Sequence, residues 1–140
     1  MQPGSQKRKT VQFRLDLRSG VPVYRQIIDQ VIGGIASGSL VCGDQLPTVR
    51  QLAVDLSINP NTVIRAYREL EIRGLLETQQ GTGTFIGPQK IQAQDDAERS
   101  RRLGQLTEDF IARAGSEGFT VEELIGNLQA VQNNAKQRRR

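Results

Sequence analysis

Three side chains that can form paired hydrogen bonds recur at helical spacing near the middle of the 140-residue chain. Asn61, Arg65 and Arg68 occupy positions i, i+4 and i+7, so a helix through them carries all three on one face. Asn can form two hydrogen bonds to the edge of adenine, and Arg two to guanine, in the major groove of DNA. The pattern therefore predicts a helix that reads duplex DNA. The alternative is the solvated polar face of an ordinary surface helix.

The segment that carries these residues has clear helix signals. Asn59 is suited to be the N-cap, Pro60 is accepted at the first helical position, and Gly74 suits the end. The opposite face is apolar and is expected in the core; its members are Val63, Ala66, Tyr67 and Leu70. Tyr67 is accordingly interpreted as a core residue and not as a platform on which bases stack.

Two further helices are expected before this one. The first begins near Pro22 and ends at Gly38, and the second follows Pro47 with Thr48 as its N-cap. A turn at residues 57–59 joins the second helix to the third, which is the layout of a helix-turn-helix. The expected buried stripes are Tyr24, Ile27, Ile28, Val31 and Ile35 in the first helix, and Val49, Leu52, Ala53 and Leu56 in the second.

A β-hairpin is expected directly behind the third helix. Residues 75–79 and 84–86 have strand-like composition, and a glycine-bearing turn separates them. A hairpin in this place is a wing, and it favours DNA binding over a plain surface helix. The tip is expected to enter a minor groove, with an ordinary hairpin turn as the alternative; its residues are Gln80, Gly81 and Thr82.

Additional DNA contacts are expected around the start of the third helix. Asn59 and Thr62 lie in its first turn, where free backbone N–H groups favour phosphate. Arg50, early in the second helix, is interpreted as a phosphate clamp. An ion pair from Arg50 to Asp55 or Asp44 is the alternative.

Composition argues against several other classes of protein. There is no histidine and one cysteine, so a His-based catalytic site or a Cys/His zinc site cannot be assembled. No metal or cofactor is expected, and catalysis has no supporting motif. Cys42 is expected as a small, half-buried filler, because a redox switch would need a thiol from another subunit. No apolar run approaches the roughly 20 residues of a membrane span, so we expect a cytoplasmic protein without membrane contact.

Charge is distributed unevenly along the chain. Residues 1–89 hold ten basic and seven acidic residues, whereas residues 93–131 hold four basic and eight acidic ones. This favours one surface for phosphates and another for a different partner. The basic residues near both ends are compatible with a role in binding phosphates and equally with an effect on solubility alone.

Four stretches of the central region carry a long and specific pattern: GDQLPTVRQLA at 43–53, NPNTVIRAYRELE at 59–71, RGL at 73–75 and GTGTF at 81–85. Together they closely resemble the GntR family of transcription regulators, from about residue 11 to residue 86. The resemblance implies a winged helix-turn-helix, dimeric binding to a palindromic operator and control by a small effector. Larger members often carry an Arg where this chain has Pro60, so base reading must depend on Asn61 and Arg65. The DNA contacts implied by the resemblance are Arg50, Asn59, Asn61, Thr62, Arg65 and Gly81.

About fifty residues follow Gly87, too few for the large ligand-binding domains of this family. They predict two amphipathic helices, the second opened by Thr120 and Glu123 as a capping box. Two such helices cannot bury both apolar stripes alone, so we expect pairing with the same segment of a second subunit. Folding back on their own winged domain is the alternative. The stripes are Leu103, Leu106, Phe110 and Ala114, and Val121, Leu124, Leu128 and Val131.

The expected fold is mainly α with a small β wing. It comprises a disordered basic lead at residues 1–10, a winged helix-turn-helix at 11–87 and a helical dimerisation segment at 93–138. In its short length the chain resembles the YtrA-type branch of the family, whose members resemble regulators of transporter operons. The expected function is a homodimeric regulator, a repressor by preference, bound to double-stranded operator DNA. A winged-helix protein-interaction module is the alternative, and an enzyme or the detached front end of a fused aminotransferase-like regulator is disfavoured.

Overall fold

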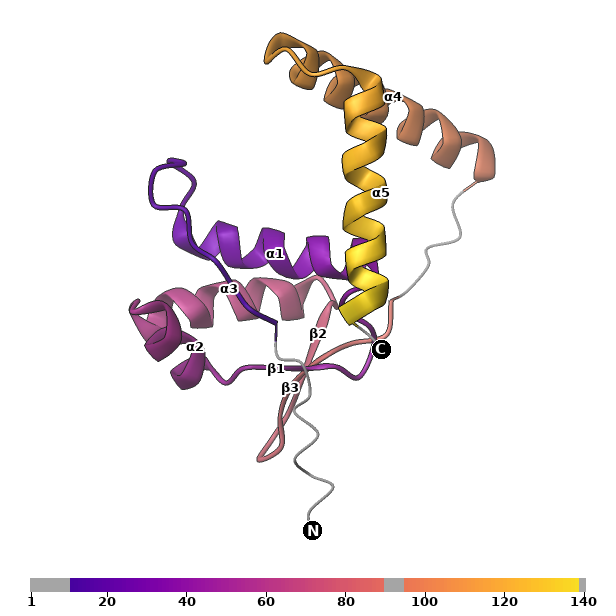
Figure 1. Cartoon of the computed structure of the whole chain (residues 1–140). Coiled ribbons are helices and arrows are strands. Elements are labelled where there is room, and N and C mark those ends of the chain that lie inside the picture. Colours follow the sequence, from indigo (N-terminus) through magenta and orange to yellow (C-terminus); the bar gives the residue numbers. More distant parts are fainter. Residues whose placement is uncertain (1–10, 90–94, 139–140) are drawn as a thin grey trace. The chain divides into compact units, whose positions relative to one another are not determined.

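The computed structural model describes residues 11–89 and 95–138. The chain divides into two compact units, essentially residues 1–90 and residues 91–137. The first unit holds three helices and a small sheet, and the second holds two helices (Figure 1). None of the helices in the described ranges is long and apolar enough to cross a membrane.

Helix α1, Val23–Ser37, follows Pro22 and ends at Gly38. Gly38 has φ +85°, a left-handed conformation that costs glycine little, and its N–H donates to the carbonyl of Ile35. Ile27, Ile28 and Val31 are fully buried. Tyr24 and Ile35 are partly buried and pack against the same core. The predicted stripe of the first helix is therefore confirmed, with its two ends closer to the surface.

Helices α2, Val49–Leu56, and α3, Pro60–Ile72, form the helix-turn-helix. The Thr48 hydroxyl accepts a hydrogen bond from the Gln51 N–H, and the Asn59 side-chain carbonyl accepts one from the Asn61 N–H. Both predicted N-caps are thus confirmed. Between the helices, Ser57 adopts a left-handed conformation with φ +54°. All four predicted core residues of α3 are buried, and α3 packs against α1, α2 and the sheet.

The sheet has three antiparallel strands in the order β1-β3-β2. Strands β2, Leu76–Gln79, and β3, Gly83–Ile86, form the predicted hairpin, with Thr78 opposite Thr84. Strand β1, Gln45–Leu46, pairs with β3 and was not predicted. Two residues cannot show the alternation by which a strand is recognised in a sequence. The sheet packs against the helices through three side chains of the buried core, Leu46, Leu76 and Ile86.

The segment before α1 is an extended arm and not a paired strand. Phe13 is buried in the core, and two glutamines of α1 hold the arm's backbone. The Gln30 side chain accepts a hydrogen bond from the Arg14 N–H and donates one to the Arg14 carbonyl. Along the arm, side chains alternate between the core side and solvent up to residue 16, whereas Leu17 is 81% exposed. The chain has already entered a turn there.

The second unit consists of α4, Asp96–Ser116, and α5, Val121–Arg138. These helices have 21 and 18 residues. Asp95 is the N-cap of α4, and its side chain accepts a hydrogen bond from the Ala97 N–H. The predicted capping box is confirmed: the Thr120 N–H donates to the Glu123 carboxylate, and the Glu123 N–H donates to the Thr120 hydroxyl.

Candidate nucleic-acid interface

The outer face of α3 presents the residues expected to read DNA. Because Val63, Ala66, Tyr67 and Leu70 anchor one face in the core, the opposite face must point to solvent. This outer face borders a shallow depression, which brings together three expected residues and three unexpected ones. The lining residues are Asn61, Arg65, Arg68, Ile64, Glu69 and Ile72.

Arg65 has a defined position on this face. Its guanidinium carbon lies 3.8 Å from the centre of the Tyr24 ring, which belongs to α1. Sequence reasoning assigned Tyr24 to the core and missed this contact, since sequence spacing relates residues within a helix but not between helices. Glu69, one turn after Arg65, pairs instead with Arg73 at 2.8 Å. The carboxylate that could neutralise Arg65 is therefore engaged elsewhere.

The start of α3 is polar and open to solvent. Asn59 and Asn61 are exposed, and Thr62 is partly buried. The side chain of Asn59 serves the helix as its N-cap, through a hydrogen bond of 2.9 Å to the Asn61 N–H. The first turn of a helix carries N–H groups without helical partners, and together with the helix dipole these favour an anion.

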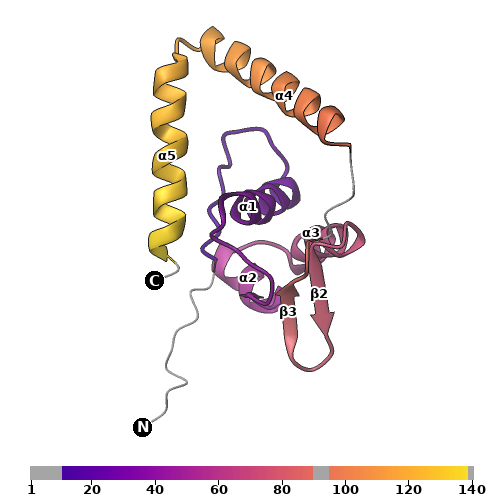
Figure 2. The ribbon, with the colours of Figure 1, turned by 90° about the vertical axis from the view of Figure 1, so that its right-hand side faces the viewer.

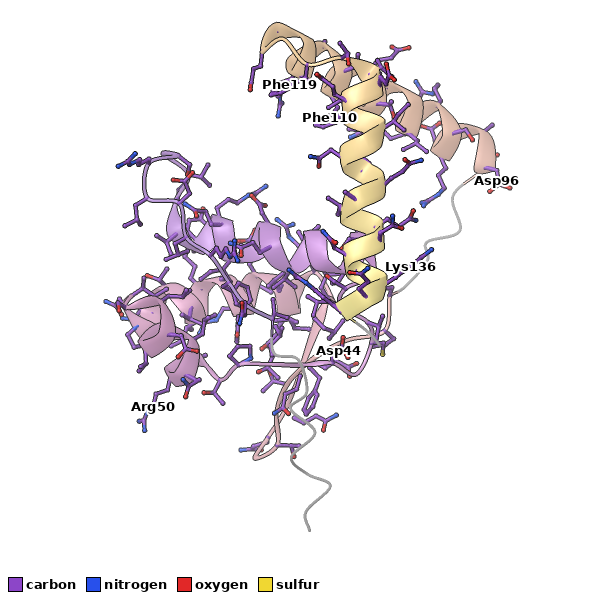
Figure 3. All side chains as sticks on the ribbon, in the orientation of Figure 1. Asp44, Arg50, Asp96, Phe110, Phe119 and Lys136 are labelled. Atoms are coloured by element: carbon purple, nitrogen blue, oxygen red, sulfur yellow. The ribbon has the colours of Figure 1, made fainter. Side chains whose placement is uncertain are left out.

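Arg50 is exposed at the start of α2, and its side chain projects away from the helix (Figure 3). It forms no ion pair within residues 11–89 and 95–138. The Asp55 carboxylate, one candidate partner, accepts a hydrogen bond from the Gln51 side chain at 2.7 Å. The Asp44 carboxylate, the other candidate, accepts one from the Val41 N–H at 2.9 Å. Arg50 is thus left available to an external anion.

The wing projects from the helical body with its loop at the free end (Figure 2). Gly81 has φ +80°, and the Thr82 N–H donates to the Gln79 carbonyl at 2.9 Å to close the turn. Gln80, Gly81 and Thr82 are exposed. The Gln45 side chain donates to the Thr82 carbonyl at 3.3 Å, so β1 also supports the tip.

Two residues singled out in the sequence are settled by their surroundings. Tyr67 is a core residue, as predicted; its hydroxyl donates to the Pro47 carbonyl at 2.7 Å, and burial raises the pKa of its phenol. Cys42 is exposed, so the expectation of a half-buried filler is wrong. Cys42 lies in the turn at residues 42–43, which leads into β1 and places the thiol outside the core.

The apolar stripes of the second unit are largely uncovered within that unit. Ala114 is buried and Leu124 is partly buried. The other members expose roughly half of their surface or more: Leu103, Leu106, Phe110, Val121, Leu128 and Val131. A contiguous group of exposed apolar side chains is typical of a surface that binds another molecule.

Together, the helix-turn-helix, the hairpin behind it and the unpaired cations on α2 and α3 define a winged-helix DNA-binding protein. Residues 23–86 match the family described as "Bacterial regulatory proteins, gntR family". The HTH-type transcriptional regulator Rv1152 of Mycobacterium tuberculosis (strain ATCC 25618 / H37Rv) is 49% identical over 119 residues, covering 85% of this chain and 93% of the relative. The chain belongs to the GntR family.

Two further relatives place the chain near short members of this family. The HTH-type transcriptional repressor YtrA of Bacillus subtilis (strain 168) is 48% identical over 74 residues, covering 53% of this chain and 57% of the relative. The solved structure of YtrA from Sulfolobus acidocaldarius, a GntR-family transcription factor, superposes with a TM-score of 0.52 at 32% identity, covering 74% of this chain and 97% of the other. The chain is a DNA-binding transcriptional regulator and not an enzyme.

Proposed function

We infer that the protein reads a specific operator by inserting α3 into the major groove. The observation that carries this inference is a group of side chains with unused hydrogen-bonding capacity. Asn61, Arg65 and Arg68 border one depression, and their side chains form no hydrogen bond or ion pair within the described residues. When such a side chain forms two hydrogen bonds to one base, the contact contributes about 1–3 kcal/mol of discrimination against the other bases.

Phosphate contacts surround the base-reading group. Arg50 on α2 clamps the backbone, and Asn59 and Thr62 present the first turn of α3 to a phosphate. The wing tip, at Gln80, Gly81 and Thr82, enters the adjacent minor groove. The glycine at the tip has no side chain to hinder close approach.

The partner that covers α4 and α5 is a second copy of this chain. Two amphipathic helices bury both stripes when they pair with the same two helices of another subunit, which gives a two-fold interface. A two-fold dimer binds a palindromic operator, with half-sites about one helical turn apart or a multiple of it. The exposure of Leu106, Phe110 and Leu128 supports this arrangement.

Membership of the GntR family supports a proposal for the biological role. A relative is named a transcriptional repressor, so we propose repression, in the cytoplasm, where bacterial DNA lies. A transporter operon is the proposed target. The proposed site for a small effector is the subunit interface. The genes adjacent to this one would test the choice of target.

The direct test is selection of bound DNA from a random pool, followed by a mobility shift on the recovered site. We expect a two-fold symmetric site, nanomolar affinity and a steep loss of affinity as salt rises. Recovery of no preferred sequence, together with salt-insensitive binding, would contradict the proposal. That result would favour the alternative function, in which α3 docks on a protein.

A further inference from the structure

We propose that Tyr24 is a positioning residue for base recognition, which holds the guanidinium of Arg65 ready for guanine. This inference rests on the proposed function, because it concerns how one residue of the DNA-reading face is oriented. The main observation behind it is that the guanidinium carbon of Arg65 lies over the Tyr24 ring, 3.8 Å from the ring centre. No other described residue contacts Arg65 through a hydrogen bond or an ion pair.

The geometry of stacking explains why the contact orients Arg65 without consuming it. A guanidinium is planar, and its five N–H donors point outward within that plane. With its central carbon 3.8 Å from the ring centre, the Arg65 guanidinium lies over the ring with one flat face, so the donors at its edge remain available for guanine O6 and N7. A carboxylate partner would instead occupy the same edge.

Two features of the surroundings maintain this arrangement. Tyr24 lies on α1, which packs against α3, and its ring is partly buried against the core, so it forms a stiff platform. Glu69 is turned toward Arg73, with which it pairs at 2.8 Å. Arg65 is therefore held by a ring and kept from the nearest carboxylate on its own helix.

Pre-orientation lowers the entropy that a long side chain loses on binding. A free arginine must select one rotamer when it meets the base, and immobilising such a long side chain has an entropic cost. A side chain already held against a ring loses less. The stack on Tyr24 therefore contributes to affinity and specificity even if Tyr24 itself never touches DNA.

The test compares Tyr24→Leu with Tyr24→Phe, each alone and combined with Arg65→Ala, on the operator recovered by selection. The Tyr24 hydroxyl forms no hydrogen bond within the described residues, so Tyr24→Phe retains the stacking face and removes nothing else. We expect Tyr24→Leu to weaken operator binding about two- to fivefold, the range of an exposed cation–π contact. We expect Tyr24→Phe to stay close to wild type.

Base discrimination separates positioning from general stability. The base pair read by Arg65 is the one at which Arg65→Ala loses discrimination between G·C and other pairs. Tyr24→Leu should lower discrimination at that pair alone, leave binding to random DNA unchanged and have no further effect in Arg65→Ala. An equal loss on all sequences, an equal loss with and without Arg65, or no loss at all would overturn the proposal.

A readout on the free protein keeps the two proposals distinguishable. Nitrogen-15 relaxation of the Arg65 Nε–H should show a restrained side chain in wild type and Tyr24→Phe, and a mobile one in Tyr24→Leu. A side chain that is equally mobile in all three would refute the role of Tyr24, whatever the outcome of DNA binding. Failure of the wild-type protein to select any operator would refute the proposed function instead. Thermal unfolding of each variant shows that binding is measured on folded protein.

Discussion

At the scale of single residues, the structure separates polar groups that serve the fold from those left for a partner. Gln30 binds the backbone of the arm, and Arg73 neutralises Glu69. Arg50 and Arg68 have no such role within the described residues. Since exposed ion pairs contribute about 0–1 kcal/mol to stability, leaving these cations unpaired costs the fold little.

Arg65→Ala and Arg50→Ala should weaken DNA binding in two different ways. Arg65→Ala should cost about 1–3 kcal/mol on the operator and relax preference at one base pair. Arg50→Ala should weaken binding almost equally on all sequences and lower the salt dependence by about one released counterion. Titration of operator and random DNA at several salt concentrations distinguishes them. Identical profiles would contradict the assignment of one Arg to a base and the other to a phosphate.

The burial of Tyr67 makes the free energy of unfolding depend on pH in the alkaline range. Burial raises the pKa of its phenol above the value of about 10 of an exposed tyrosine, so the folded state keeps a proton that the unfolded chain releases. The contribution of Tyr67 to the free energy of unfolding should therefore be fully present below about pH 10 and should be lost as pH rises further.

The control for this prediction is Tyr67→Phe. This variant should be about 1 kcal/mol less stable at neutral pH, because the hydrogen bond to the Pro47 carbonyl is lost. Its stability should fall less steeply than that of the wild type above about pH 10. Urea unfolding at neutral and alkaline pH measures both effects, and parallel curves for the two proteins would disprove the explanation.

At the scale of elements, the first turn of α3 has both a structural and a proposed functional role. Asn59 caps the helix from within, while the outward surface of the same turn is proposed to meet phosphate. A substitution here therefore changes folding and binding together unless the cap is preserved. Aspartate preserves it, because Asp and Asn rank equally as N-caps.

Asn59→Asp should retain the stability of the wild type yet weaken DNA binding, since its added negative charge faces the phosphates. Asn59→Ala should lose about 0.5–2 kcal/mol of stability through the missing cap. Thermal unfolding and mobility shifts on the same samples measure the two effects. If Asn59→Asp bound DNA as tightly as wild type, Asn59 would not lie near a phosphate.

At the scale of the whole molecule, the chain combines a unit with a complete core and a unit without one. The winged unit has a buried core of large apolar side chains, including Ile27, Leu52, Val63 and Leu70. Helices α4 and α5 instead leave Leu106, Phe110 and their neighbours uncovered within their own unit. Their stability is therefore expected to depend on association.

If the proposed dimer forms through α4 and α5, Leu106→Lys should convert it into monomers, because this substitution places a charge in the centre of the proposed interface. Gln105→Lys adds the same charge on the opposite face of α4 and should leave the dimer intact. Sedimentation equilibrium over a range of concentrations separates the two variants. Operator affinity should fall with the dimer, since each subunit then binds only one half-site. A dimeric Leu106→Lys protein would place the interface elsewhere.

Local signals were sufficient to predict most elements of this protein. Helix starts at Thr48, Asn59 and Thr120 and the ends at Gly38 and Gly74 depend on backbone geometry within a few residues, and the described structure agrees with them. The core face of α3 follows from helical spacing alone. The family pattern between residues 43 and 85 then indicated the winged fold and the class of function.

Tertiary structure alone decided the features that join distant segments. Strand β1 exists because β3 supplies its hydrogen-bond partners, and the arm at residues 11–16 is held by side chains of α1. Arg65 meets Tyr24 because α1 packs on α3, a contact across forty residues of sequence that no local spacing encodes. Sequence periodicity specifies which face of an element is apolar, whereas packing between elements specifies which polar side chains remain free. The proposed DNA-reading face was therefore predictable as a set of residues on one exposed side of a helix, and the orientation of Arg65 became visible only in the folded chain.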